Sequence, residues 1–197
     1  MTPNTSPSPW PVHTARLTLR PARADDLAAV GGYRVLPEVN EWLPSAPRTP
    51  EDHVAHITDK PGRLEKTLVV ELDGIVIGDL FLSIEDAWGQ AEVAERAEKV
   101  QAEVGWCLDP AYQGRGYASE ATAGLLRVCF QDLGLRRVVA LSFADNTASW
   151  RLMERLGMRR ETYNVRESLH RNGEWLDGVG YALLADEWRD RNRAAGR

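Results

Sequence analysis

A glycine-containing turn between an expected strand and an expected helix places the strongest constraint on the fold of this chain. Residues 102–108 alternate apolar and polar side chains, as a strand does, and Asp109-Pro110 ends that run. In residues 116–133 apolar side chains recur every three or four positions, which predicts a helix that ends at Gly134. The short connection between them brings a strand end directly onto a helix N-terminus.

That turn is suited to bind a phosphate. The first turn of a helix has unpaired N–H groups and a positive dipole end. Gly114 and Gly116 let an anion approach the backbone closely, and Arg115 adds positive charge. A P-loop is excluded because no Gly-Lys-Ser/Thr follows, and a dinucleotide-binding motif is excluded because Ser119 stands where its third glycine would be. The alternative is a tight turn that merely requires glycine.

The order of the other elements predicts a mixed α/β fold and excludes a doubly wound parallel sheet. Further strands are expected at 16–19, 67–72, 75–84, 137–142, 159–169 and 175–184, and further helices at 24–35, from 50 onward and at 146–156. Asp73-Gly74 and Asn172-Gly173 are two-residue turns typical of hairpins. The last two strands are therefore expected to pair with each other, as are the strands at 67–72 and 75–84.

The length of 197 residues fits one domain with additions. The proline-rich residues 1–12 predict a flexible tail or a wrapping arm, and 13–197 a single domain. Residues 85–101 interrupt two strands with five acids and two bases, so they carry −3 of the chain's net charge of −5. We expect this acidic insertion to form a helix or a solvated excursion.

Composition excludes several classes of function. The net charge of −5 argues against nucleic acid as the main partner. No run approaches 18 apolar residues, and the first 12 residues have no apolar core, so neither a membrane span nor a signal peptide is expected. Cys107 and Cys129 lie in apolar runs, which predicts buried thiols and a reducing, cytoplasmic location. His53 and His56 are expected to be a surface pair, and no metal site is predicted.

The residues Gln113-Gly-Arg-Gly-Tyr-Ala118 resemble the Q/R-x-x-G-x-G/A motif of the GNAT superfamily of N-acetyltransferases. The surrounding EVGWCLDPAYQGRGYASEA and the later ADNTASWRLMERLGM look like its branch of ribosomal-protein N-terminal acetyltransferases. The resemblance extends over about 15–188. It implies an α/β (α+β mixed) fold whose central sheet is mostly antiparallel, has six to seven strands and is flanked by helices. This sheet would be splayed between the strand of Glu103 and the strand of Val139, with acetyl-CoA as co-substrate in the splay.

The resemblance also implies which residues bind acetyl-CoA. The backbone of the turn would hold the pyrophosphate, and the edge of the strand before it would bind the pantetheine amides. Asn146 would contact the pantetheine arm, a role compatible with that of a helix N-cap. The residues expected to bind are Cys107, Leu108, Gln113, Gly114, Arg115, Gly116, Tyr117, Ala118, Ser119 and Asn146.

For catalysis, an incoming ammonium must lose a proton and a leaving thiolate must be stabilised. Many relatives carry a tyrosine seven residues after the asparagine, but here that position is Met153. The resemblance points instead to Ser149, which would stabilise the thiolate by a hydrogen bond. Glu103 aligns with the strand carboxylate that is the base in several relatives, and Glu167 is the second candidate. The alternatives are a small helix residue for Ser149 and a solvated or ion-paired strand residue for Glu103.

The function implied is acetyl-CoA-dependent transfer of an acetyl group to a primary amine, by direct attack in a ternary complex. The acceptor would be a protein N-terminus or a small molecule, and the protein a monomer or homodimer. Tyr33, Trp42 and Trp175 are candidates to line the acceptor pocket, whereas Trp88 and Trp150 fit the core equally well. The alternative, supported by Met153, is a non-catalytic acyl-CoA-binding sensor or partner protein.

Overall fold

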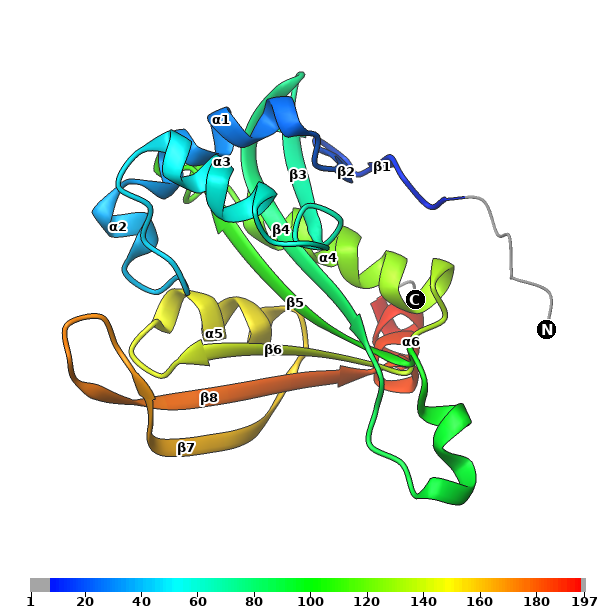
Figure 1. Ribbon diagram of the computed structural model, residues 1–197. Coiled ribbons are helices and arrows are strands. Elements are labelled where there is room, and N and C mark those ends of the chain that lie inside the picture. Colours follow the sequence, from blue (N-terminus) through cyan, green and yellow to red (C-terminus); the bar gives the residue numbers. More distant parts are fainter. Residues whose placement is uncertain (1–7, 196–197) are drawn as a thin grey trace.

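Eight strands form one sheet in the computed structural model, which describes residues 8–195 (Figure 1). The strands are β1 (Val12–His13), β2 (Thr18–Pro21), β3 (Thr67–Leu72), β4 (Ile75–Glu85), β5 (Gln101–Leu108), β6 (Arg137–Phe143), β7 (Arg159–Leu169) and β8 (Trp175–Leu184). Their order is β1-β2-β3-β4-β5-β6-β8-β7, and only β5 and β6 are parallel. The predicted fold class is confirmed. The sheet has one strand more than the predicted six to seven, and its edge strand β1 has only two residues.

Within residues 8–195, six α-helices flank the sheet. They are α1 (Leu27–Arg34), α2 (Pro37–Asn40), α3 (Pro50–Thr58), α4 (Tyr117–Arg127), α5 (Thr147–Arg155) and α6 (Ala185–Ala195). Short 3₁₀ helices span Ala24–Asp26, Ala91–Ala97 and Pro110–Tyr112. A π-helical turn, Val128–Asp132, continues α4, so the helix predicted over 116–133 is α4 plus this turn.

Local sequence signals explain several element ends. Asp73 and Gly74 both have positive φ, at 51° and 80°, as a two-residue turn between β3 and β4 requires. Thr49 caps α3 by accepting a hydrogen bond from the Asp52 N–H, and Pro50 occupies the first helical position. These features are as the sequence predicts.

Two apolar cores lie on opposite faces of the sheet. Along β5, Val104 belongs to the larger core, which also contains Leu125 of α4 and Met153 of α5. Cys107 lies on the other face, in a smaller core with Val30 of α1. The alternation of side chains along β5 therefore places α4 and α5 on one face and α1 on the other.

The sheet splits between its two parallel strands. β5 and β6 pair over only three positions, of which Glu103 opposite Val139 is the last. Beyond it, β5 continues along β4 as far as Leu108 opposite Gly78, while β6 continues along β8 as far as Phe143 opposite Gly178. Figure 1 shows β5 rising away from β6. This divergence is the splay that the family resemblance implies.

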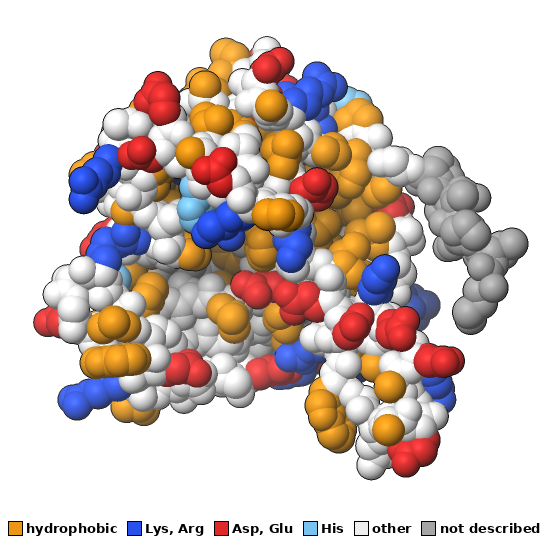
Figure 2. All heavy atoms as spheres, in the orientation of Figure 1, with side chains coloured by type: hydrophobic (Ala, Val, Ile, Leu, Met, Phe, Trp, Pro, Cys, Tyr) orange, Lys and Arg blue, Asp and Glu red, His pale blue; other side chains and the backbone are white. Residues whose placement is uncertain are grey.

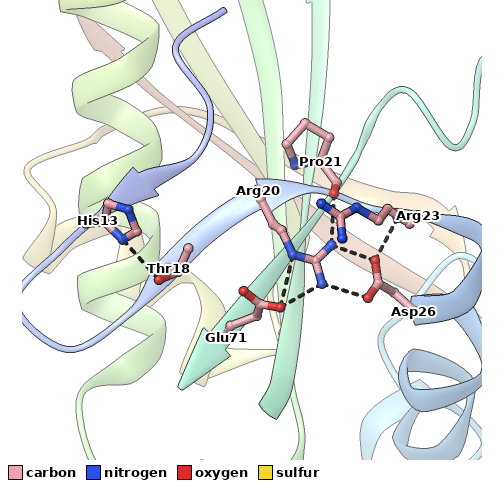
Figure 3. Close-up of polar contacts among 7 residues, drawn as sticks. All are labelled: His13, Thr18, Arg20, Pro21, Arg23, Asp26 and Glu71. Carbon is pink, nitrogen blue, oxygen red and sulfur yellow. Dashed lines mark hydrogen bonds and ion pairs between the residues drawn. The ribbon is translucent and has the colours of Figure 1, made fainter. Parts of the chain in front are cut away.

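An arginine joins β2, β3 and the entry to α1. The Arg20 guanidinium donates to both carboxylate oxygens of Asp26, at 2.7 and 2.8 Å, and to Glu71 at 2.6 and 3.0 Å (Figure 3). Asp26 also accepts from the Arg23 N–H at 2.7 Å, which closes the turn before α1. The hydrogen bond from Arg20 lowers the pKa of Asp26, although burial opposes this shift. The start of α1 is thereby fixed relative to the sheet.

The acidic insertion is an arm with its own hydrogen bonds. The Lys99 N–H donates to the Asp86 carboxylate at 2.8 Å, and the Ala87 N–H donates to the Ala97 carbonyl at 2.7 Å. The arm leaves the sheet between β4 and β5 and projects away from it (Figure 1). Trp88 is 88% exposed, so the interpretation of Trp88 as a core residue is wrong.

A polar cluster is buried beneath α1 and α3. Asp79 of β4, 3% exposed, accepts from the Tyr33 hydroxyl at 2.7 Å and from Arg34 Nε at 3.0 Å. His53 is only 2% exposed, so the prediction of a surface histidine pair is wrong for it. Neither ring nitrogen of His53 has a hydrogen-bond partner among the described residues. Burial, with a smaller effect of Arg34, lowers the pKa of His53 to about 4.

The N-terminal segment reaches the body of the molecule. Trp10 packs against the larger core, and Val12 is buried in β1. Residues 1–7 of the predicted tail lie outside the described residues.

We expect Asp79→Ala to lower the free energy of unfolding by about 3 kcal/mol, because it leaves the largely buried Arg34 without its counter-ion. Urea unfolding followed by circular dichroism measures the change. Glu95→Ala, at an exposed position of the arm, is the control and should leave stability unchanged. A loss for Asp79→Ala below about 1 kcal/mol, typical of an exposed pair, would contradict the structural role of the cluster.

Candidate acetyl-CoA and acceptor site

The turn between β5 and α4 is an exposed loop with two left-handed residues. The Asp109 carboxylate accepts from the Ala111 N–H at 2.9 Å and starts the short 3₁₀ turn that follows β5. Gly114 and Gly116 have φ of 75° and 80°, which glycine adopts without steric cost. The Gln113 side chain donates back to the Leu108 carbonyl at 3.1 Å. The side chain of Gln113 thus holds the turn in place, and residues 113–116 are exposed.

The first turn of α4 is open to a ligand. Gly116 is the N-cap and no side chain caps the helix, so the N–H groups of Tyr117, Ala118 and Ser119 lack a capping acceptor. The Arg115 guanidinium lies beside this end, 5.9 Å from the ring centroid of Tyr112. The arrangement combines free N–H groups, a helix dipole and a cation, which together suit a phosphate.

The end of β5 borders the split. Cys107 and Leu108 pair with β4 on one side, and on the other side no described residue of β6 pairs with them. The Cys107 thiol is buried, and burial raises its pKa to about 12. Cys107 therefore contributes backbone rather than thiol chemistry. Both cysteines are free and buried, as predicted.

Glu103 lies at the apex of the split. It belongs to the last residue pair that joins β5 to β6, and on its other side it pairs with Ser83 of β4. Its side chain is half-buried on the face of the sheet that α1 covers. Burial raises the pKa of Glu103, Glu85 raises it further and Lys66 opposes the shift. A carboxylate in this setting is a stronger base than an exposed one.

The start of α5 lies at the end of β6. Asn146 is its N-cap, and the Asn146 side-chain oxygen accepts from the Ser149 N–H at 3.3 Å. Because β5 and β6 are parallel, α4 and α5 begin at the same edge of the sheet, one on each side of the split. Met153, at the position of the relatives' tyrosine, is 1% exposed and belongs to the larger core.

Glu167 lies far from Glu103. It is exposed on β7, accepts from Asn164 Nδ2 at 2.6 Å and lies over Gly178, where an added Cβ would be 3.1 Å from its oxygen. Gly178 pairs with Phe143, four residues along β6 from the partner of Glu103. Four residues of strand span roughly 13 Å. The two carboxylates therefore share one face of the sheet but cannot serve the same reacting atom directly.

Three aromatic rings form a bridge at the open end of the split. Trp42 lies 5.7 Å from Phe143 and 5.3 Å from His170, measured between ring centroids. His170 Nε2 is 3.0 Å from the Glu41 carbonyl, and Arg171 donates to the carbonyls of Glu41 and Leu43. The segment after α2 is thereby tied to the β7–β8 hairpin.

Figure 2 shows a hollow between the α1–α3 side of the molecule and the β6–β8 side, with acidic side chains beside it. Of the aromatic candidates for this region, Trp42 is at the bridge, whereas Tyr33 is buried against Asp79 and Trp175 is 57% exposed. Phe143 and His170 were not singled out in the sequence. Phe143 reaches the split because β6 pairs with β8, and His170 reaches it because β7, which it follows, pairs with β8 as well.

Comparison with known proteins identifies the family. Residues 16–159 match the model of the acetyltransferase (GNAT) domain. An uncharacterised N-acetyltransferase of Bacillus subtilis, YnaD, is 31% identical over 179 residues, which cover 90% of this chain and 98% of YnaD. The chain belongs to the GNAT family, whose members use acetyl-CoA, and it is an N-acetyltransferase.

Solved structures agree in fold. A GNAT-family acetyltransferase from Bacillus anthracis has a TM-score of 0.74 and 32% identity, covering 89% of this chain and 99% of its own. RimL, a ribosomal L7/L12 α-N-protein acetyltransferase in complex with coenzyme A, has a TM-score of 0.71 and 19% identity, covering 88% and 97%. The fold is therefore shared with an enzyme of the ribosomal-protein branch.

No helix among residues 8–195 is long and apolar enough to cross a membrane. The same residues contain no group of three or more side chains suited to hold a metal ion.

We expect Gly116→Val to abolish binding of coenzyme A, because valine is strained at φ 80° and its side chain would occupy the turn. Isothermal titration calorimetry measures the affinity. Gly134→Val is a matched control, since Gly134 has φ 65° and nothing within 4 Å of an added Cβ. Unchanged affinity in Gly116→Val, or an equal loss in Gly134→Val, would contradict the assignment of the turn.

Proposed function

We propose that this protein transfers the acetyl group of acetyl-CoA directly to a primary amine within a ternary complex. The observation that carries the proposal is the position of Glu103, a half-buried carboxylate at the point where the β5–β6 ladder ends. The open turn of α4 begins on one face of the sheet, and Glu103 faces the other. Acetyl-CoA would extend from the turn into the split, and the amine would arrive from the face of Glu103.

In the proposed reaction Glu103 accepts a proton from the acceptor ammonium, directly or through water. The free amine attacks the thioester carbonyl, so that a C–N bond forms and the C–S bond breaks, and the proton that the attacking nitrogen must still lose passes to the departing thiolate. Until that proton arrives the leaving thiolate needs a hydrogen-bond donor, and the Ser149 hydroxyl in the first turn of α5 is the candidate. Asn146, one turn earlier, would contact the pantetheine arm while it caps α5.

The separation of Glu103 and Glu167 gives them different proposed roles. We assign the base to Glu103, because Glu167 is exposed and lies beyond Phe143, toward the open end. Glu167 would instead contact the distal part of a longer acceptor, such as a peptide. A protein N-terminus and a small-molecule amine both fit this arrangement.

The sequence alone also allowed a non-catalytic acyl-CoA sensor, because Met153 stands where many relatives have a tyrosine. Release of coenzyme A, measured with a panel of peptides, amino acids and polyamines, separates the two. We expect release that depends on an amine. Tight binding of acetyl-CoA without turnover on any amine would support the sensor, and no binding would contradict both.

We expect Glu103→Gln to lower turnover by about 100-fold or more, within the usual contribution of a general base, and to leave the affinity for acetyl-CoA nearly intact. Because the base acts only when ionised, wild-type activity should rise with pH through the raised pKa of Glu103. This acidic limb should disappear in Glu103→Gln. A pH series of kcat/KM measures it.

Glu85→Gln is the matched control. The Glu85 charge contributes to the raised pKa of Glu103, so its removal should move the acidic limb to lower pH without removing it. Turnover that is unchanged in Glu103→Gln would refute Glu103 as the base. In that case Glu167→Gln tests whether the second carboxylate acts through water.

A further inference from the structure

Arg16, in the connection between β1 and β2, lies against the phosphate turn although it is 99 residues away from Arg115 in sequence. Its Nη1 donates to the Arg115 carbonyl at 3.1 Å, and its guanidinium lies over the Tyr117 ring, 4.4 Å from the centroid. Arg16 therefore touches both sides of Gly116. Neither the motif nor the family resemblance pointed to it.

Glu120 of α4 holds Arg16 in this position. One carboxylate oxygen accepts from the Thr14 hydroxyl at 2.6 Å and from the Arg16 N–H at 2.7 Å. The other accepts from Arg16 Nε at 2.7 Å. Burial opposes ionisation, but the hydrogen bonds from Thr14 and Arg16 lower the pKa of Glu120. The side chain is thus charged and fully engaged with the β1–β2 connection.

The remaining edge of the guanidinium is directed at the glycine turn. Arg16 Nη2 lies 3.5 Å from the position that a Cβ on Gly116 would occupy, which is the space that the glycine leaves open. No described residue accepts a hydrogen bond from Nη2. The Arg16 side chain is 45% exposed, so a ligand can reach it.

Arg16 supplies a cation next to an acidic residue of the helix start. Glu120 lies in the first turn of α4, where an uncompensated carboxylate would repel a phosphate and compete for the helix dipole. The ion pair with Arg16 removes that negative charge. Nη2 then adds a donor on the ligand side, and a guanidinium suits phosphate oxygens well.

We propose that Arg16 binds the diphosphate of acetyl-CoA and that Glu120 and Tyr117 preorganise it for this role. The inference rests on the proposed function, because it concerns the same turn. It assigns to the site a third wall, formed by the N-terminal β1–β2 connection, in addition to Arg115 and the first turn of α4. Without a contact to the diphosphate, Arg16 would have only a structural role, that of linking the β1–β2 connection to α4.

The test is calorimetric affinity for coenzyme A and for dephospho-coenzyme A, which lacks the 3′-phosphate but keeps the diphosphate. We expect Arg16→Ala to weaken both by about tenfold, the effect of one hydrogen bond to a charged group. Arg16→Lys, which keeps the charge without the fork, should lose less. A loss confined to coenzyme A would place Arg16 at the 3′-phosphate and overturn the proposal.

Two further measurements distinguish a ligand-binding role of Arg16 from a purely structural one. Acetyl-pantetheine lacks both the diphosphate and the 3′-phosphate, so its kcat/KM as acetyl donor should be equal in wild type and Arg16→Ala. If Arg16→Ala lowered kcat/KM for acetyl-pantetheine as much as it lowers the affinity for coenzyme A, the role of Arg16 would be structural only. The double variant Arg16→Ala/Glu120→Gln also removes the repulsion between the Glu120 carboxylate and the phosphates. Its affinity for coenzyme A should nevertheless stay below that of wild type. Full recovery would show that Arg16 merely screens Glu120.

The outcome for the wild-type protein distinguishes this inference from the proposed function. If wild type binds coenzyme A and Arg16→Ala binds it equally well, the role of Arg16 is refuted and the function stands. If wild type does not bind coenzyme A, the proposed function fails, and the inference fails with it.

Discussion

The three residue pairs that join β5 to β6 are the constraint on which the rest of the site depends. They are enough to set the two strands parallel, and parallel strands deliver α4 and α5 to the same edge of the sheet. They are too few to hold the strands together beyond Glu103. A longer ladder would bury the edge of β5, and a shorter one would leave Glu103 outside the apex. The position of the carboxylate and the opening in front of it therefore share one structural cause.

A split sheet needs support from other elements, and the two faces supply it differently. On one face a single apolar core continues beneath both halves, since Val104 of β5 and Val138 of β6 belong to it together. On the other face the halves are joined at a distance, through the segment after α2 and the ring contacts of Trp42. Packing thus keeps the apex closed, and the aromatic bridge fixes the width of the open end.

Sequence patterns predicted the elements whose signals are local. The β3–β4 hairpin follows from Asp73-Gly74, and the α4 turn follows from its two glycines. The errors concern contacts between distant segments. The helical pattern of α3 does not reveal that His53 faces α1 and β4, and the composition of the arm does not reveal that Trp88 faces solvent. The role proposed for Arg16 depends on α4 meeting the β1–β2 connection, which no local pattern encodes.

Charge is distributed unevenly along the proposed binding path: it is positive at the turn of α4 and negative at the apex of the split. The protein carries a net charge of −5, yet the turn of α4 presents Arg115 and Arg16, with Glu120 neutralised between them. At the apex the balance is reversed, because Glu85 lies close enough to raise the pKa of Glu103. In the proposed reaction, anionic acetyl-CoA and an acceptor ammonium would thus be attracted to different ends of one split. Since opposite charges are favoured at each end, the two substrates can bind together without competing for the same surface.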